Sequence, residues 1–167
     1  KLYVINSKEG RGSNSIKTIS IKVNATSISI GDIDKDGSAD MVISSSLLNP
    51  QSGESMGESK TVNSNSVILW GNKGNFSSDQ KTELVAPYSV STAIADIDGD
   101  GRQDIICAIE HGEKTYTAES RIFFGKGNRT FEQSKKGIPS SGAYDIAVIP
   151  SDITGTSHVI ICNRMTG

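Results

Sequence analysis

The chain has 167 residues, 35% of them hydrophobic and 5% aromatic, and its formal net charge is −2 at pH 7. So small a net charge gives no basic surface of the kind that binds nucleic acid, and no apolar run approaches the roughly 20 residues of a membrane span. We therefore expect one folded domain that neither binds nucleic acid nor inserts into a membrane.

The first segments of the chain predict two β-strands. Lys1–Asn6 and Ile16–Val23 are short and apolar, and turn-forming residues lie between them. The stretch "KLYVINSKEG" is also a weak copy of "SVILWGNKGNF" (Ser66–Phe76) and of "SRIFFGKGNRTF" (Ser120–Phe131). An apolar strand followed by a turn with Gly or Asn is common to all three, which indicates an internal repeat.

The segment "GDIDKDGSADMVIS" (Gly31–Ser44) crowds four carboxylates into one loop and then continues as an apolar strand. Its pattern D-x-D-x-D-G-x-x-D offers oxygen ligands at positions 1, 3 and 5, a glycine for the sharp turn at 6 and a backbone carbonyl at 7, as a calcium loop does. The last ligand is an Asp at position 9, and the loop closes before a strand, so it does not look like an EF-hand. The predicted ligands are Asp32, Asp34, Asp36, Asp40 and the carbonyl of Ser38.

The pattern returns in "ADIDGDGRQDIICA" (Ala95–Ala108), after a polar stretch, Leu48–Ser66, that we expect to be an extended surface loop. Two solvated Asp/Gly turns are the alternative interpretation. Two copies at the same place in a longer repeat favour two Ca²⁺ sites instead. The predicted ligands of the second loop are Asp96, Asp98, Asp100, Asp104 and the carbonyl of Arg102.

Each full unit contains four short β-patterned segments, and no segment shows a sustained helical period. In the second unit the predicted strands are Val90–Asp96, Asp104–Ile109, Arg121–Phe124 and Thr130–Gln133. Four strands per repeat, called A to D from the innermost outward, are typical of a β-propeller blade. The predicted fold is therefore all-β, with about three blades' worth of strands.

The last unit has a degenerate loop. "SDITGTSHVIIC" (Ser151–Cys162) keeps an Asp at the first ligand position, Asp152, but Thr154 and Thr156 replace the next two. His158 or a gap falls at the last ligand position, so we expect no metal there. The predicted strands of this unit are Ala143–Pro150 and His158–Cys162. The whole chain then divides into half a blade at 1–24, full blades at 25–88 and 89–140, and half a blade at 141–167.

The two loops, each followed by an apolar strand and a "VILWGNKGNF" or "IFFGKGNRTF" hairpin, resemble FG-GAP/VCBS-type repeats. These are the blades of integrin α-chain-like propellers and of many secreted bacterial proteins. The resemblance implies that each calcium loop joins strand A to strand B on one face of a propeller. It also implies that partners bind on the opposite face, through the connections from B to C and from D to A.

Three other sets of residues are candidates for a functional role. Cys107 and Cys162 align with Ile43, so we expect buried, unbridged thiols rather than a disulfide or a nucleophile. Trp70 and Phe124 align with each other and should pack between blades. The two histidines, His111 and His158, are predicted to be exposed loop residues, and no catalytic constellation is present.

These features predict a calcium-stabilised binding or adhesion module for a glycan or protein partner, secreted to the extracellular space, the cell surface or the periplasm. The alternative is the propeller portion of a secreted polysaccharide-degrading, lyase-like enzyme. Any ligand contacts are expected from Leu48–Ser66, Tyr88 and His111–Glu119 with Tyr116. Because propellers have roughly 4 to 8 blades, the remaining blades would come from a longer chain or from a second copy.

Overall fold

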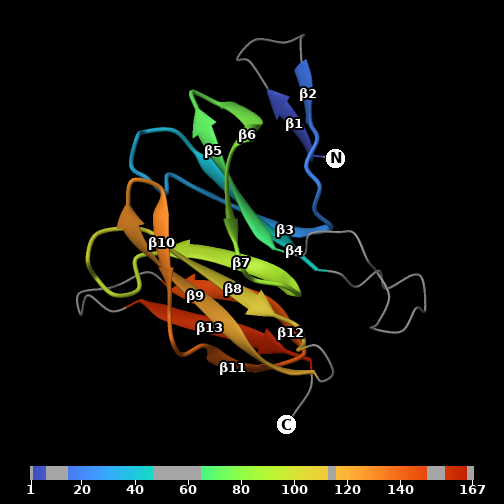
Figure 1. The fold of residues 1–167 in the computed structure, drawn as a ribbon, viewed down its shortest axis with the longest axis vertical. Helices are drawn as coiled ribbons and strands as arrows, with labels where there is room; N and C mark the ends of the chain where they lie inside the picture. The colour runs from blue at the N-terminus through green and yellow to red at the C-terminus, as the bar shows by residue number, and fades with distance from the viewer. Residues whose placement is uncertain (1, 7–14, 47–64, 113–115, 150–156, 165–167) are drawn as a thin grey trace.

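The structure, a computed structural model, describes residues 2–6, 15–46, 65–112, 116–149 and 157–164. This part of the chain forms thirteen β-strands and contains no helix (Figure 1). The all-β prediction is confirmed. The strands are β1 (Leu2–Asn6), β2 (Ser15–Ile19), β3 (Ala25–Gly31), β4 (Asp40–Ser45), β5 (Ser66–Asn72), β6 (Asn75–Leu84), β7 (Ser89–Ala95), β8 (Asp104–Ile109), β9 (Thr117–Gly127), β10 (Thr130–Gln133), β11 (Ile138–Ser141), β12 (Ala143–Ile149) and β13 (His158–Asn163).

The strands form two larger antiparallel sheets between two strand pairs. The first sheet has the order β3-β4-β5-β6, and the second has β7-β8-β9-β10, with β11 also pairing with β9. The N-terminal pair is β1-β2 and the C-terminal pair is β12-β13. Apart from β11, each strand pairs only with strands that are its neighbours in sequence, as is common in antiparallel sheets.

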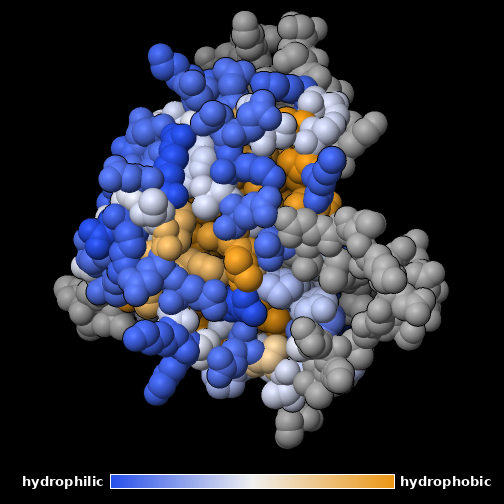
Figure 2. Space-filling model, in the orientation of Figure 1, coloured by the Kyte–Doolittle hydropathy of each residue, from blue (hydrophilic) through white to orange (hydrophobic). Residues whose placement is uncertain are grey.

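Three apolar layers hold these sheets face to face. The layer between the first and second sheets contains Val42, Trp70, Ile105 and Phe123. A second layer joins the first sheet to the N-terminal pair, and a third joins the second sheet to the C-terminal pair. In Figure 2 the visible face is mainly hydrophilic, and apolar residues come to the surface where the two larger sheets meet. Packing between sheets is therefore the main source of hydrophobic burial in this part of the chain.

The strand pairs and sheets thus form a stack in chain order, in which the first strands of neighbouring units lie side by side: β7 contacts both β3 and β12. Hydroxyl groups link these strands: the Thr26 Oγ1 donates to the Ser89 carbonyl at 2.8 Å, and the Ser29 Oγ donates to the Thr92 carbonyl at 2.5 Å. Small hydroxyl side chains allow β3 and β7 to approach closely, which agrees with the Ser and Thr residues of these two strands.

The predicted strands of the second unit are present with shifted ends. β7 begins one residue earlier than predicted, and β9 extends on both sides of Arg121–Phe124. The structure adds β11, which the sequence did not predict, and Ser66 begins β5 rather than ending the preceding loop. Residues 48–64 of that loop lie outside the described residues, as do Asp152, Thr154 and Thr156.

The register of the C-terminal pair corrects the alignment of the cysteines. Cys107 is opposite Thr92, and the corresponding opposite pair in the last unit is Ile161 with Ile146. Cys162 therefore lies one position further along its strand. Cys107 is buried as predicted, whereas Cys162 is exposed, because β13 pairs only with β12 within the described residues. Both thiols are free.

No helix long and apolar enough to cross a membrane is found among the described residues.

Candidate metal centre and the opposite face

Each acidic loop is built by hydrogen bonds from its own backbone to its own carboxylates. In the second loop the Asp96 carboxylate accepts from the Gly101 N–H at 2.8 Å, and Asp98 accepts from the Asp100 N–H at 3.2 Å. Asp100 accepts in turn from the Arg102 N–H at 2.8 Å. The last two bonds join residues two apart and are the Asx-turn contacts that favour Asp in tight turns, whereas the first bridges five residues across the loop. The first loop repeats all three of these bonds, from Gly37 to Asp32, from Asp36 to Asp34 and from Ser38 to Asp36.

The glycine at position 6 has a direct conformational cause. Gly37 and Gly101 both have φ of 85°, a backbone conformation that L side chains rarely adopt. The equal angles show that the two loops share one backbone turn, as their common pattern predicts.

Three of the four predicted carboxylates converge in each loop. Carboxylate oxygens of Asp32, Asp34 and Asp40 lie within 4.8 Å of one another. The same is true of Asp96, Asp98 and Asp104. Oxygen donors of this kind are the ligands of a hard dication such as Ca²⁺, so the donor set of both loops fits calcium.

The other predicted ligands are not part of these two clusters. The Asp36 side chain accepts from the Ser38 N–H and contacts Arg129, while Asp100 contacts Arg102. The backbone carbonyls of Ser38 and Arg102 remain predicted ligands. If calcium is bound through all five groups, the Asp36 and Asp100 carboxylates must use oxygens that already have other partners.

The last Asp of each loop has a structural role that the sequence did not reveal. Asp40 is fully buried and accepts from the Ile33 N–H at 2.9 Å and from the Gly71 N–H at 2.8 Å. Its carboxylate therefore links the loop to β5. Burial raises the pKa of Asp40, and the two backbone hydrogen bonds oppose this increase. Asp104 is equivalent: it is buried, it accepts from Ile97 and Gly125 at 2.8 and 2.9 Å, and burial raises its pKa.

The two glycines that donate to these carboxylates are strand residues, not turn residues as the sequence indicated. A Cβ on Gly71 would lie 2.0 Å from the Ala39 carbonyl oxygen, and one on Gly125 would lie 2.4 Å from that of Gln103. No side chain fits at such distances. These glycines allow the loop to approach the third strand of its own sheet closely enough for the buried hydrogen bond.

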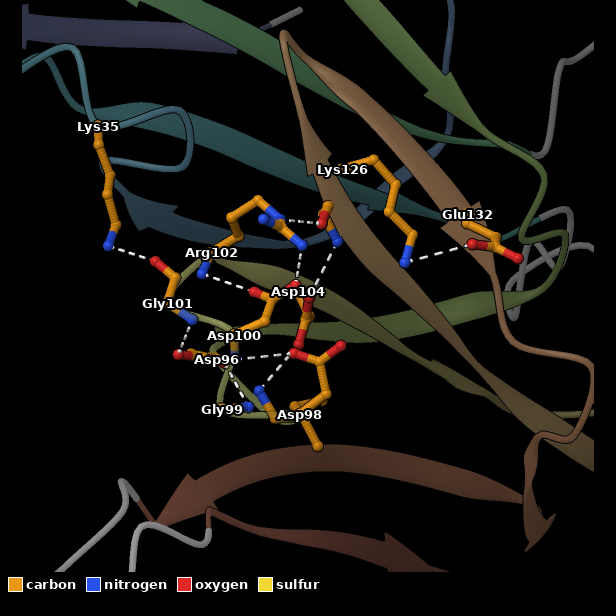
Figure 3. A network of polar contacts seen from close by, with 12 residues as sticks. Lys35, Asp96, Asp98, Gly99, Asp100, Gly101, Arg102, Asp104, Lys126 and Glu132 are labelled. Atoms are coloured by element: carbon orange, nitrogen blue, oxygen red, sulfur yellow. Dashed lines mark hydrogen bonds and ion pairs between the residues drawn. The ribbon is translucent and has the colours of Figure 1, made fainter.

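Cationic side chains surround both loops. Arg102 donates through Nε to the Gly125 carbonyl at 2.7 Å and also pairs with Asp100 (Figure 3). Lys35 of the first loop extends toward the second loop and donates to the Gly101 carbonyl (Figure 3). Arg129 pairs with Asp34 at 2.6 Å and with Asp36 at 3.3 Å. These contacts partly balance the negative charge that the loops concentrate.

At the other end of the sheets, the structure brings together several residues predicted to contact a ligand. The rings of Tyr88 and His111 are 4.2 Å apart, and Tyr116 meets His111 edge-on at 6.3 Å. Tyr88 and His111 line an open cavity of about 520 Å³, which Glu119 and Arg121 also line. Tyr88 has φ of 63°, a strained conformation for an aromatic residue.

The prediction that His111 is an exposed loop residue was wrong. His111 is only 1% exposed, and its ring contacts those of Tyr88 and Tyr116. The Nδ1 atom is 2.6 Å from the Gly112 carbonyl, which can only accept, so Nδ1 is the donor. The buried Nε2 has no hydrogen-bond partner in the structure. His158 is exposed, but it begins β13 and lies opposite Ile149, at the position that Asp104 takes opposite Ala95.

The remaining predictions concern packing. Trp70 is buried between the two larger sheets, as predicted, and stacks with Phe131 at 6.4 Å. Phe124 is only half-buried and lies under the Lys126 ammonium. Burial raises the pKa of the Cys107 thiol to about 12, which suppresses the reactive thiolate.

Comparison with known proteins supports the repeat. Residues 96–158 match the family model of the FG-GAP-like repeat. No curated protein and no solved structure gives a significant match. The matched region begins at the first Asp of the second loop and ends at His158, so it spans one complete interval between corresponding loops. Over these residues the chain is similar to an FG-GAP-like repeat, as the resemblance in its loops indicated.

Proposed function

We propose that the protein is a calcium-stabilised extracellular binding module, in which the two acidic loops hold Ca²⁺ and the opposite face binds a glycan or protein partner. The observation that carries the calcium proposal is the convergence of three carboxylates within 4.8 Å in both loops, on the same backbone turn. Such groups repel one another unless a cation is present.

The role of calcium is structural on this proposal. Asp40 joins the converging carboxylates of the first loop to the Gly71 N–H in β5, and Asp104 joins those of the second loop to Gly125 in β9. A metal held by these loops would therefore stabilise the connection between three strands of each sheet. Binding to the folded state alone raises stability by linkage.

An extracellular or periplasmic location agrees with loops that need free calcium. Extracellular calcium modules bind with a Kd of about 10⁻⁴ to 10⁻³ M. Both loops are partly exposed, and acidic residues of each pair with a nearby arginine: Asp34 and Asp36 of the first loop with Arg129, and Asp100 of the second with Arg102. We therefore propose affinities in this range.

The proposed partner site is the cavity beside Tyr88 and His111. It lies at the end of the sheets away from the acidic loops, and its lining includes the exposed Glu119 and Lys135. Aromatic rings beside polar groups of both signs suit a hydroxyl-rich glycan or a polar protein segment. The positive φ of Tyr88 supports a binding role, because strained residues gather at functional sites.

Two experiments test the proposal. Thermal unfolding with calcium and with EDTA should give a higher Tm in calcium for the wild type. The difference should shrink when Asp34 and Asp98 are both changed to Asn. A glycan array, run beside an assay for glycan cleavage, tests the partner site with Tyr88→Ala as the control. Cleavage of a glycan without stable binding would favour the polysaccharide-degrading alternative. Glycan binding that is unchanged in Tyr88→Ala would show that this cavity is not the binding site.

A further inference from the structure

Arg129 belongs to the second sheet but contacts the loop of the first. It lies in the turn between β9 and β10, and its Nε is 2.6 Å from one carboxylate oxygen of Asp34. Its Nη2 is 3.3 Å from Asp36. Asn128 and Arg129 both have positive φ, 50° and 61°, so this turn has an uncommon backbone conformation. Arg129, which belongs to the second sheet, thus places its positive charge beside two predicted calcium ligands of the first sheet.

The guanidinium is held by more than its ion pairs. It lies 4.8 Å from the centroid of the Trp70 ring, which is buried in the layer between the sheets. The Asp34 side chain is only 14% exposed, and that of Arg129 is 35% exposed. Partial burial and stacking on an aromatic ring make this arginine less mobile than one in an ordinary surface ion pair.

A second contact runs in the opposite direction between the same two sheets. Lys35, in the first loop, donates to the Gly101 carbonyl in the second loop. The first acidic loop is therefore connected to the second sheet both through Lys35 and through Arg129. In the second loop, the arginine that pairs with Asp100 is Arg102 of the same loop, and among the described residues no ion pair joins this loop to another sheet.

We propose that Arg129 is a built-in counterion of the first loop, which lowers the calcium affinity of that loop and couples calcium binding to the contact between the two sheets. The inference rests on the proposed calcium function. Arg129 offsets the repulsion between Asp34 and Asp36 when no metal is bound. A dication among the same carboxylates is repelled by the guanidinium, so arginine and calcium oppose each other. By reciprocity, calcium then weakens the contact of Arg129 with the loop and with Trp70.

The competing interpretation is that Arg129 only orients Asp34 and Asp36 for the metal. The two interpretations predict opposite signs. Loss of an orienting residue would lower the calcium affinity of the first loop, whereas loss of an opposing charge would raise it.

The test is a calcium titration of Arg129→Gln and of the wild type, in which binding is measured both by calorimetry and by tryptophan fluorescence. Trp70 is the only tryptophan in the chain, so its emission reports on the first loop. We expect the calcium affinity of the first loop to rise about three- to tenfold at low ionic strength. The change in Trp70 emission on calcium binding should become much smaller, because the guanidinium no longer leaves the ring.

Two control variants separate charge from geometry and from general effects. Arg129→Lys keeps the charge but not the planar fork, so its calcium affinity should stay near that of the wild type. Arg164 is a matched control: it pairs with Glu110 at 3.5 Å and lies 4.3 Å from the Tyr144 ring, away from both loops. Arg164→Gln should leave both calcium affinities unchanged.

An unchanged or lower affinity of the first loop in Arg129→Gln, with two calcium ions still bound by the wild type, would overturn this inference and leave the proposed function intact. A wild-type protein that binds no calcium would overturn both. Circular dichroism in EDTA checks that Arg129→Gln is folded. If it is not, Arg129→Met, which retains packing on Trp70, is used for the same measurement, with the same expected rise and the same contradictory result.

Discussion

At the scale of single residues, the carboxylates of each loop divide into two roles. Asp40 and Asp104 are buried and accept two backbone hydrogen bonds each, so they support the fold whether or not a metal is bound. Asp36 is more exposed and accepts a local bond from Ser38. The last Asp of the pattern D-x-D-x-D-G-x-x-D therefore supports the fold in addition to converging with two other carboxylates, whereas Asp36 lies outside that cluster.

We predict that Asp40→Asn destabilises the protein even in EDTA, whereas Asp36→Asn does not. An amide oxygen can replace only one of the two carboxylate oxygens, so the N–H of Ile33 or of Gly71 is left buried without a partner. The cost is about 1–3 kcal/mol. Asp36→Asn keeps the acceptor for Ser38 and relieves repulsion, so the change should stay within about 0.5 kcal/mol. Urea unfolding in EDTA measures both, and equal effects would contradict the division of roles.

The raised pKa values of Asp40 and Asp104 predict a pH dependence for the metal-free protein. A carboxyl whose folded pKa is above its unfolded value adds stability that is fully present below the unfolded pKa, here 3.8. This stability is lost as the pH rises through the folded pKa. In EDTA the free energy of unfolding of the wild type, compared with an Asp40→Asn, Asp104→Asn variant, should therefore decline from about pH 4 to pH 7. A difference that grows with pH would contradict burial as the dominant cause.

At the scale of the strands, the position of a strand in the stack of sheets decides how much each apolar residue contributes to the free energy of unfolding. Ile106 in β8 and Ile160 in β13 occupy the same register position, opposite Ala93 and Ala147 respectively. Ile106 is fully buried because the C-terminal pair covers it, whereas Ile160 is 47% exposed. Equivalent residues thus have different environments at the centre and at the end of the stack.

Replacement of these two isoleucines tests this difference. Ile106→Ala should lower the free energy of unfolding by about 2–5 kcal/mol, because it leaves a cavity in a closed layer. Ile160→Ala should cost less than about 1 kcal/mol, because water already reaches the side chain. Chemical denaturation gives both values. A cost for Ile160→Ala as large as that for Ile106→Ala would show that another surface covers Ile160 in solution.

Sequence patterns predicted most strands because alternation and turn residues are local signals, as for Asp104–Ile109 and Thr130–Gln133. They predicted the loops because Asp and Gly recur at fixed spacing. They could not reveal the buried bond from Asp40 to Gly71 or the contact of Arg129 with Asp34, because these join residues distant in sequence. The burial of His111 escaped prediction for the same reason: it depends on Tyr88, which belongs to the preceding connection.

At the scale of the whole molecule, the two ends of the stack carry exposed apolar side chains at positions that are covered elsewhere. Ile28 and Ile30 of β3 are 43% and 65% exposed, whereas the corresponding Ile146 and Val148 of β12 pack against the second sheet. Ile160 shows the same contrast at the other end. We propose that further blades, from a longer chain or from a second copy, cover both ends.

Sedimentation analysis of the 167-residue chain tests this proposal. We expect self-association, or low stability that improves when neighbouring repeats are added, because two apolar faces and two strand pairs are open to solvent. A stable, cooperatively folded 17.7 kDa monomer in dilute solution would contradict the need for further blades.

The most direct test of the calcium proposal is the stoichiometry of calcium binding, measured by isothermal titration calorimetry on protein first freed of metal. We predict two Ca²⁺ ions per chain in the wild type. Asp34→Asn should lose the ion of the first loop and Asp98→Asn that of the second, because each removes one of three converging carboxylates. Absence of binding in millimolar calcium, or a stoichiometry that neither substitution changes, would contradict the assignment of the loops as calcium sites.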